Sequence, residues 1–328
     1  MSRWTDFQSP LADGIRRFLA AKRAIARRYR TEEYALRLLD RFLVAQAVAR
    51  GDQLTAELLD AFLASRPRAR PRSFNHLLGV VRRCLDWLVG QGVLPGSPLR
   101  ARPRRETARR VPCLFDLPQA RWLLEAAGRL PDNPKGPGRG PTYRTLFALL
   151  YGLGLRVGEA CRLRCGEVDL ERALLVVQGA KFGKSRLVPC GPRMAGLLQA
   201  QLARRAGGGA APEPQAPLFT FDGRHGIAPE SVSRTFRQLV RRLDLAVPAG
   251  TAPPRLHDLR HSFAVGTLLR WYRAGVDPAA RLHHLATFLG HVDPASTAVY
   301  LTITADLLRE ANRRFEAFAG SALGEGAP

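Results

Sequence analysis

The chain has 328 residues, and because 46% of them are apolar it is long enough to bury two separate cores. It carries 51 Lys and Arg against 28 Asp and Glu, a formal net charge of +23 and a pI near 11.3, which indicates a polyanionic partner such as DNA, RNA or an anionic membrane surface. A membrane is disfavoured, because the longest apolar stretch, Thr145–Leu155, is too short to span a bilayer and runs directly into Arg156, and because Met1–Gln8 lack the apolar core of a signal peptide.

The first third of the chain is predicted to be helical. Apolar residues recur there at spacings of three and four, as at Leu77, Leu78, Val81, Leu85 and Leu88. This periodicity predicts four amphipathic helices in a compact bundle, at Pro10–Arg28, Thr31–Arg50, Thr55–Ala64 and Ser73–Gly92. Their polar faces carry many arginines and few acidic residues, which favours a DNA-binding surface over an ordinary surface of mixed charge.

A basic segment rich in proline, Leu94–Pro112, is predicted to divide the chain. Its arginines are Arg100, Arg102, Arg104, Arg105, Arg109 and Arg110. Two interpretations are open, a solvated connector and an extended stretch that follows a phosphate backbone. The domain boundaries that we predict are a helical DNA-binding domain at 1–94, a basic linker at 95–111 and a second domain at 112–328.

The second domain is predicted to be mainly helical, with a small sheet. The apolar, β-branched runs Leu170–Gln178 and Ser185–Pro189 flank Gly179–Lys184, a pattern typical of a hairpin or sheet edge with a basic tip. A stripe of apolar residues along Ala305–Ala319 predicts an amphipathic terminal helix. The whole chain is therefore expected to be mainly α with a small antiparallel β-sheet.

Residues suited to phosphodiester chemistry occur in separated segments of the second domain. Two arginines can fork onto the oxygens of one phosphate, histidines can move protons, and a phenol can become covalently attached to phosphorus. In chain order, these residues are Arg156 within Gly154–Glu159, His257 and Arg260 within His257–His261, His291 within Leu289–His291, and Tyr300.

Four segments around these residues resemble the catalytic motifs of the tyrosine recombinases, the phage-integrase and Xer-type family. They are LGLRVGEACRL, GAKFGKSRLVP, HDLRHSFA and LGHVDPASTAVY. They occur in the family's order, with the same nine-residue step from His291 to Tyr300. The resemblance extends from about Leu114 to the end of the chain, and the N-terminal bundle resembles the core-binding domain of the family in its layout. It implies that 112–328 is the catalytic domain.

The resemblance implies roles for three residues at the phosphate. Arg156 and Arg260 would bind the scissile phosphate and stabilise its transition state. Lys181, at the hairpin tip, would be the general acid for the leaving 5′ oxygen. An acid at that oxygen contributes on the order of a hundredfold to the rate, because the oxygen would otherwise leave as an alkoxide.

It also implies roles around the nucleophile. Tyr300 would attack the phosphorus, and its phenol, with a pKa of about 10 in water, has to lose its proton as it does so. His257 would assist as an acid or base, and His291 would donate a hydrogen bond to the phosphate. Glu159 and His261 match the family pattern too and would hold the other residues in place.

The implied reaction is a transesterification on double-stranded DNA. Tyr300 would form a 3′-phosphotyrosyl link and release a 5′ hydroxyl, which then attacks a partner duplex, without any metal ion, ATP or other cofactor. The family's pairwise strand exchange implies a homotetramer on a target with inverted half-sites. The tail TITADLLREANRRFEAFA resembles recombinases of transposons and other mobile elements, some of which act with sister recombinases. The sequence thus predicts a site-specific recombinase or integrase for integration or excision of a mobile element.

Alternatives to this function stay open. A type IB topoisomerase would use the same residues to nick and reseal one strand, and an accessory recombinase would be inactive without partner proteins. An RNA-binding protein is disfavoured, because aromatic stacking motifs are missing. Taken singly, Tyr300 could be a packing tyrosine, Arg156 could only pair with Glu159, and Lys184 or Arg186 could replace Lys181.

Cysteine usage bears on compartment and metal binding. The five cysteines, an odd number without a CxxC pair, are Cys84, Cys113, Cys161, Cys165 and Cys190. They suggest neither a disulfide framework nor a zinc site, and His257 and His261 lack a third ligand, so no metal is expected. A reducing cytoplasm is the expected location.

Overall fold

The structure is a computed structural model of the chain. It describes residues 6–25, 29–105, 111–134, 136–178, 185–243, 250–291 and 295–302, together with residues 245, 247, 293 and 309. The chain divides between Arg109 and Arg110 into two compact units, and each unit has a hydrophobic core of its own.

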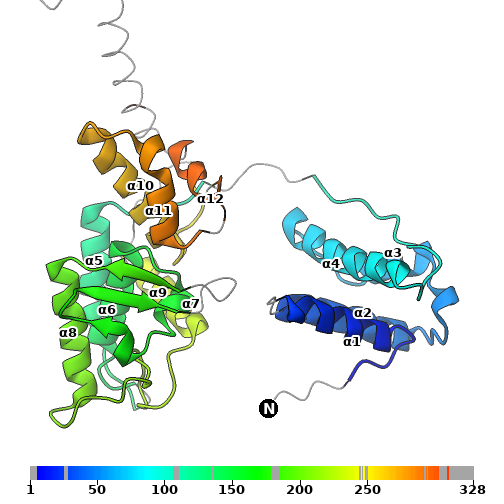
Figure 1. Cartoon of the computed structure of the whole chain (residues 1–328), viewed down its shortest axis with the longest axis horizontal. Helices are drawn as coiled ribbons and strands as arrows, with labels where there is room; N and C mark the ends of the chain where they lie inside the picture. The colour runs from blue at the N-terminus through cyan, green and yellow to red at the C-terminus, as the bar shows by residue number, and fades with distance from the viewer. Residues whose placement is uncertain are drawn as a thin grey trace, which may run out of the picture. The chain divides into compact units, whose positions relative to one another are not determined.

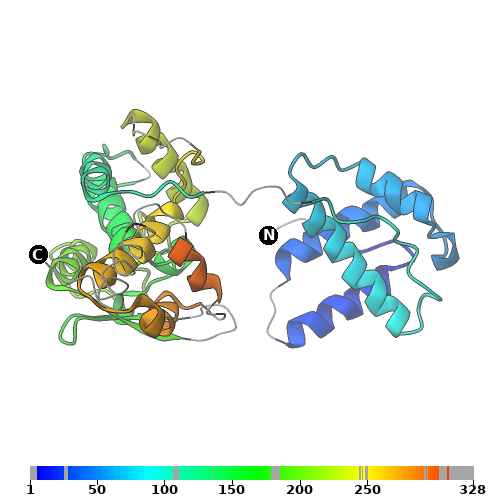
Figure 2. The same cartoon turned by 90° about the horizontal axis from the view of Figure 1, so that it is seen from above.

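The first unit is a helical bundle (Figures 1 and 2). Helix α4 packs against both α1 and α2. The predicted helices are confirmed, although the first two end earlier than their apolar periodicity indicated. The elements are α1 (Ala12–Ala24), α2 (Arg30–Ala45), the 3-10 helix η1 (Gly51–Gln53), α3 (Ala56–Ala64) and α4 (Pro71–Gly90).

Local capping and burial explain where these helices begin. Thr55 lies just before α3, and its side-chain oxygen accepts a hydrogen bond from the backbone N–H of Leu58 at 3.2 Å. Pro71 opens α4, where the N–H that proline lacks would have no helical partner. One face of α4 is buried in the bundle core, including Val81 and Leu85.

The first half of the predicted linker packs on the bundle. Leu99 and Ala101 contact its core. Asn75 of α4 donates to the carbonyl oxygen of Arg104 at 2.8 Å and accepts from its backbone N–H at 2.7 Å. The guanidinium of Arg104 lies 4.0 Å above the ring of Phe74. Residues 95–105 therefore belong structurally to the first unit, whereas 106–110 lie outside the described residues.

The second unit is built around one buried helix, α6 (Arg139–Gly152). Helices α5 (Leu117–Gly128), α8 (Pro192–Ala206) and α10 (Asp258–Arg273) pack against it (Figure 1). A helix that is covered on all sides has to be apolar all round, which explains the long apolar stretch that begins at Thr145. No helix in the described ranges is both long and apolar enough to cross a membrane.

A three-stranded antiparallel sheet, in the order β1-β2-β3, lies on the same unit. Val168 pairs with Leu175, and Val177 pairs with Arg186. The predicted fold class, mainly α with a small antiparallel β-sheet, is confirmed. The strands are β1 (Val168–Asp169), β2 (Leu174–Val177) and β3 (Arg186–Pro189).

The predicted strand Leu170–Gln178 was wrong in its first part. Residues 170–173 form the turn between β1 and β2, and Ala173 has a left-handed φ of 52° there. Arg172 donates its backbone N–H to a carboxylate oxygen of Asp169 at 2.9 Å, a local bond that favours the turn over a strand. The basic tip, residues 179–184, lies outside the described residues.

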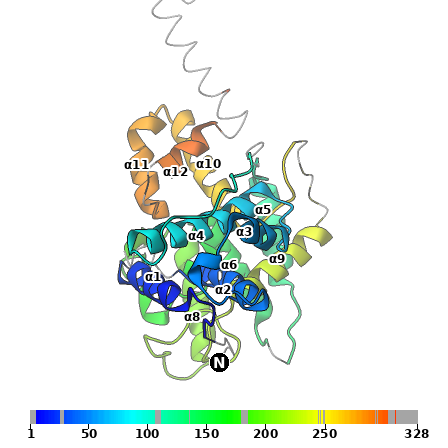
Figure 3. The ribbon, with the colours of Figure 1, turned by 90° about the vertical axis from the view of Figure 1, so that its right-hand side faces the viewer.

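The C-terminal part forms a smaller cluster. Helices α10, α11 (Pro278–Leu289) and α12 (Ala295–Ala298) lie together in Figures 1 and 3, and the 3-10 helix η4 (Val299–Thr302) contacts α10. The predicted terminal helix Ala305–Ala319 lies outside the described residues apart from residue 309. The short helix α7 (Val157–Ala160), the 3-10 helix η2 (Cys165–Glu167) and α9 (Pro229–Arg242) complete the unit.

Candidate active site

The centre of the site is Arg260, in the first turn of α10. Its side chain is 1% exposed. One terminal nitrogen donates to the carbonyl oxygen of Gly154 at 2.5 Å, and the other donates to that of Leu289 at 2.8 Å. The Nε–H is buried and has no hydrogen-bond partner among the described residues. A buried donor without a partner is costly, so this group favours an acceptor that enters from outside the chain.

The start of α10 is held in place by its own motif. Asp258 is fully buried, and its carboxylate accepts the backbone N–H of Arg255 at 2.8 Å. The hydroxyl of Ser262 donates to the carbonyl oxygen of Asp258 and accepts from the backbone N–H of Phe115, both at 2.8 Å. These bonds fix the helical turn that carries Arg260 and explain the polar residues of the segment HDLRHS.

Arg156 lies at the other side of the site, just before α7. Glu159 accepts its backbone N–H at 3.0 Å and its guanidinium at 2.8 Å, which caps the helix. The same guanidinium donates to the carbonyl oxygens of Leu289 at 3.3 Å and Gly290 at 3.0 Å. Arg156 and Arg260 thus meet at the carbonyl end of α11, which carries partial negative charge. The side chain of Arg156 stays 34% exposed and is open to a ligand.

A third arginine, Arg186 of β3, was missed as a part of this site. It donates to both carboxylate oxygens of Glu159, at 3.1 and 2.9 Å, and to the carbonyl oxygen of Phe288 at 2.8 Å. Burial opposes the ionisation of Glu159, but the hydrogen bonds from Arg186 and Arg156 lower its pKa to about 2. Arg186 was considered only as a substitute for Lys181, because no sequence spacing links β3 to the end of α11.

Two motif glycines are required by this packing. Gly290 ends α11 with a φ of 68°, and a Cβ there would lie 2.8 Å from a guanidinium nitrogen of Arg186. Gly154 has a φ of 61°, and its Cβ would lie 2.6 Å from the ring of Phe263. Gly290 therefore lets the backbone approach Arg186 closely, and Gly154 lets it approach Phe263 and Leu289.

His291 follows α11 and contacts Arg260. Its Nε2 lies 2.9 Å from Nη2 of Arg260, and its Nδ1 lies 2.6 Å from the hydroxyl of Thr297. Because arginine can only donate, Nε2 accepts in this arrangement and the ring proton lies on Nδ1. Burial, and then the charge of Arg260, lower the pKa of His291 to about 4, so the ring is neutral at neutral pH. The predicted donor role toward a phosphate requires Nε2 to leave Arg260 and to gain a proton.

Tyr300 lies on η4 and is only 3% exposed. Its hydroxyl oxygen lies 2.9 Å from Nδ1 of His261, and its ring stacks on that of His291 with centroids 6.3 Å apart. Burial raises the pKa of Tyr300, although the positive charges of Arg260 and Arg156 oppose the shift. The phenol is therefore protonated in this arrangement.

His257 forms the exposed edge of the site. It immediately precedes α10, and its ring lies edge to face against that of His261, with centroids 4.6 Å apart. Partial desolvation and the neighbouring His261 and Arg260 lower the pKa of His257. The structure thus brings together five of the six predicted site residues, Arg156, His257, Arg260, His291 and Tyr300. Lys181, the sixth, lies outside the described residues.

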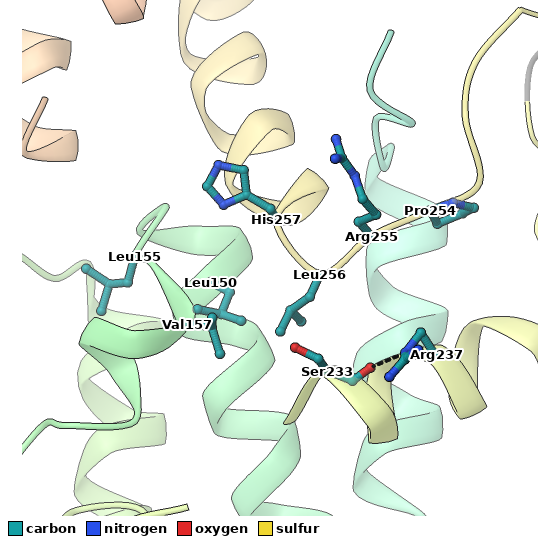
Figure 4. A pocket seen from close by; sticks show the side chains of 9 residues that line it. All are labelled: Leu150, Leu155, Val157, Ser233, Arg237, Pro254, Arg255, Leu256 and His257. Atoms are coloured by element: carbon teal, nitrogen blue, oxygen red, sulfur yellow. Dashed lines mark hydrogen bonds between the residues drawn. The ribbon is translucent and has the colours of Figure 1, made fainter. Parts of the chain in front are cut away.

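A cavity of about 310 Å³ opens beside His257 (Figure 4). Arg237 of α9 and Arg255 lie at this cavity, and Arg237 donates to the carbonyl oxygen of Ser233 at 3.2 Å. Apolar side chains from α6, α7 and the loops beside them form much of its wall. The cavity is lined by Leu150, Leu155, Val157, Ser233, Arg237, Pro254, Arg255, Leu256 and His257.

Solved structures share this fold. The Tn1549 transposon integrase in complex with a circular intermediate DNA matches with a TM-score of 0.64 at 16% identity, over 94% of this chain and 100% of that one. A lambda integrase dimer bound to a COC′ core site matches with a TM-score of 0.63 at 18% identity, over 88% of this chain and 76% of that one. A fold of this kind around grouped arginines, histidines and a tyrosine defines the class of the tyrosine recombinases.

Sequence comparison places the chain within that class. Residues 129–306 match the phage integrase family. A protein of Sinorhizobium fredii (strain NBRC 101917 / NGR234), provisionally named integrase/recombinase y4rB, is 35% identical over 318 residues, which cover 94% of this chain and 98% of the relative. The tyrosine recombinase XerC of Xanthomonas campestris pv. campestris (strain B100) is 31% identical over 266 residues, which cover 79% of this chain and 74% of the relative. The chain belongs to the phage integrase family.

Proposed function

We propose that the chain is a site-specific DNA recombinase that cleaves and rejoins DNA through a 3′-phosphotyrosyl intermediate at Tyr300, for integration or excision of a mobile element. The observation that carries this proposal is the grouping of the buried Tyr300 and Arg260 with Arg156, His261 and His291, which are partly exposed, in one cluster. A packing tyrosine does not require buried cations around it.

The free donors of the arginines suit a phosphate. The Nε–H of Arg260 is buried and lacks a partner among the described residues, and Arg156 is partly exposed beside it. A phosphate oxygen would satisfy the first donor, and the fixed positive charges would stabilise the charge that develops in the transition state. Arg237 and Arg255 extend the positive charge to the cavity beside His257, where a neighbouring backbone phosphate would lie.

The proposed step balances without a cofactor. The phenol of Tyr300 gives up its proton to a base in the site and its oxygen forms a bond to phosphorus. The bond from phosphorus to the 5′ oxygen breaks, and its electron pair stays on that oxygen. A general acid, for which Lys181 is proposed, protonates the 5′ oxygen as it leaves. The free 5′ hydroxyl of a partner duplex then reverses the step and releases Tyr300.

The site in its present arrangement is closed. Tyr300 is 3% exposed and Arg260 is 1% exposed, so a phosphate cannot reach both without movement. The residues that would move are those of η4, which carries Tyr300 and contacts α10. We propose that DNA binding opens a path to Tyr300 by moving η4 while the hydroxyl of Tyr300 stays beside His261 of α10.

The proposed partner is double-stranded DNA with inverted half-sites, on which four copies of the chain assemble. A net charge of +23 supports a DNA partner. The match with a transposon integrase bound to a circular intermediate DNA supports the mobile-element role, and sister recombinases are proposed as further partners.

The test is covalent trapping on a nicked suicide duplex that carries DNA flanking the mobile element of this gene, in the absence of a metal ion. We expect an SDS-resistant protein–DNA adduct with the wild type and none with Tyr300→Phe, because only the hydroxyl is removed. Both proteins should bind the duplex equally. Tyr34→Phe, at an exposed tyrosine of the first unit, is the matched control and should form the adduct.

Two outcomes would contradict the proposal. Loss of DNA binding together with cleavage in Tyr300→Phe would indicate a folding role for the tyrosine. Tight binding by the wild type without any adduct would indicate an accessory recombinase that needs partner proteins.

A further inference from the structure

The ring of His261 contacts the oxygen of the proposed nucleophile, and the guanidinium of Arg260 also interacts with that oxygen. Its Nδ1 lies 2.9 Å from the hydroxyl oxygen of Tyr300. The resemblance to the family implied only that His261 holds other residues in place. Tyr300 is 3% exposed in the closed site, and a phosphate bound at Arg260 would cover its hydroxyl from bulk water once the site has opened. That proton needs an acceptor inside the site when the oxygen attacks.

The hydrogen bond between the two residues favours transfer in one direction. A phenol O–H is a stronger donor than a neutral imidazole N–H, so Tyr300 donates and Nδ1 of His261 accepts. Burial, followed by the charges of Arg255, Arg260 and His291, lowers the pKa of His261 to about 4. The ring is therefore neutral at neutral pH, and Nδ1 is free to accept a proton.

The other groups that face Tyr300 and His261 cannot fill this role as they stand. Arg260 and Arg255 can only donate. Nε2 of His291 already accepts from Arg260 at 2.9 Å. His257 lies against the ring of His261, no contact of its ring with the Tyr300 oxygen is recorded among the described residues, and its side chain is exposed. Among the described residues, His261 is thus the neutral acceptor at the Tyr300 oxygen.

We infer that His261 is a catalytic residue that takes the phenol proton of Tyr300 as the oxygen attacks phosphorus. This inference rests on the proposed function. In the step, the O–H bond of Tyr300 breaks, the O–P bond forms, and the proton ends on Nδ1 of His261. The leaving 5′ oxygen takes its proton from a different group. In the rejoining step His261 returns the proton to Tyr300.

The test measures cleavage under conditions in which loss of the Tyr300 proton is the only proton transfer that affects the rate. In a suicide duplex whose leaving 5′ oxygen is replaced by sulfur, the thiolate leaves without protonation, so the pH dependence of single-turnover cleavage no longer includes the general acid. We expect the wild-type rate to be flat from neutral to mildly alkaline pH, because His261 with a pKa of about 4 is already neutral there.

The decisive variant is His261→Asn, whose amide places a hydrogen-bonding atom near the position of Nδ1 but cannot take up a proton. At neutral pH we expect its cleavage rate to fall by on the order of a hundredfold and to rise roughly tenfold per pH unit, since the phenol must then ionise by itself. His284→Asn, at an exposed histidine of α11, should match the wild type in rate and profile.

Two results would overturn the inference. A wild-type rate and a flat profile in His261→Asn would mean that the contact only positions the tyrosine. A wild-type rate that itself rises tenfold per pH unit would mean that no internal base acts, and this result needs no folded variant. If the wild type forms no adduct at all, the proposed function fails as well, so the two failures are distinguishable.

Discussion

Gly290 shows how one residue without a side chain sets the geometry of the site. It ends α11 in the left-handed region, and the carbonyl end of that helix receives hydrogen bonds from three arginines. Arg186 lies directly against it and holds Glu159, which in turn holds Arg156. A side chain at position 290 would therefore disturb both ion pairs of Glu159, the one with Arg186 and the one with Arg156.

We predict that Gly290→Ala loses more stability than Gly207→Ala. Both glycines end a helix with positive φ, 68° and 57°, but a Cβ at Gly207 meets nothing within 4 Å. Both variants should lose about 1 kcal/mol from backbone strain. Gly290→Ala should lose roughly 1–3 kcal/mol more and most of the adduct, because Arg186 must move. Urea unfolding and covalent trapping measure the two effects, and equal stabilities would contradict the role given to Arg186.

Most of the site could be predicted from sequence, because its chemistry is concentrated in short motifs. Five of the predicted residues meet in the structure, yet Arg186 was not recognised as a partner of Glu159. Arg186 is 102 residues from Phe288, whose carbonyl it binds. Such a pairing depends on how β3 and α11 pack, which local spacing does not encode. The motif pattern also did not predict that Tyr300 is buried.

Among the helices, strands and linkers, the least expected feature is that residues 99–104 of the predicted linker pack on the helical bundle. Proline and arginine content predicted a connector, but α4 supplies Asn75, which bonds both backbone groups of Arg104. The sheet was predicted correctly in type but not in extent. Residues 170–173 were predicted as the start of a strand but form a turn. The apolar run alone does not show at which residue a short strand begins after a turn.

We predict that Asn75→Ala loosens residues 99–105 without unfolding the bundle. After loss of the two hydrogen bonds, apolar contacts of Leu99 and Ala101 and the stacking of Arg104 on Phe74 still hold the segment. The bonds from Arg82 to the carbonyl oxygen of Ala101 and from Arg104 to that of Arg68 also remain. Hydrogen exchange of the segment should become about tenfold faster, as expected for a loss of about 1.4 kcal/mol. His76→Ala, at the neighbouring exposed position of α4, should leave the exchange unchanged. Unchanged exchange in Asn75→Ala would show that the remaining contacts are enough to hold the segment.

The net positive charge of the whole molecule is expected to make its DNA binding depend strongly on salt concentration. The formal charge of +23 is spread over both units, and the arginines of the first unit far outnumber its acidic residues. A protein that displaces condensed cations from DNA binds more weakly as salt rises.

We predict that the affinity of the chain for duplex DNA falls by roughly a thousandfold or more between 50 and 200 mM salt, as for proteins with six or more phosphate contacts. Fluorescence anisotropy over a salt series gives the slope of log affinity against log salt. Arg237→Ala should reduce that slope by about 1 if Arg237 contacts a phosphate. An affinity that does not depend on salt would contradict the electrostatic role of the basic surface.

The covered nucleophile has a consequence for fidelity in a genome. A chromosome offers an enormous number of wrong duplexes, and a strand-cutting enzyme with an open tyrosine would nick them at every encounter. Because Tyr300 and Arg260 lie inside the protein, under the proposed function a duplex must supply enough binding free energy to expose them before any bond breaks. Each 1.4 kcal/mol required for exposure reduces the cutting-competent fraction by about tenfold on DNA that cannot supply it. If Tyr300 cuts DNA as proposed, burial of the two side chains would act as a threshold that protects wrong duplexes from cleavage.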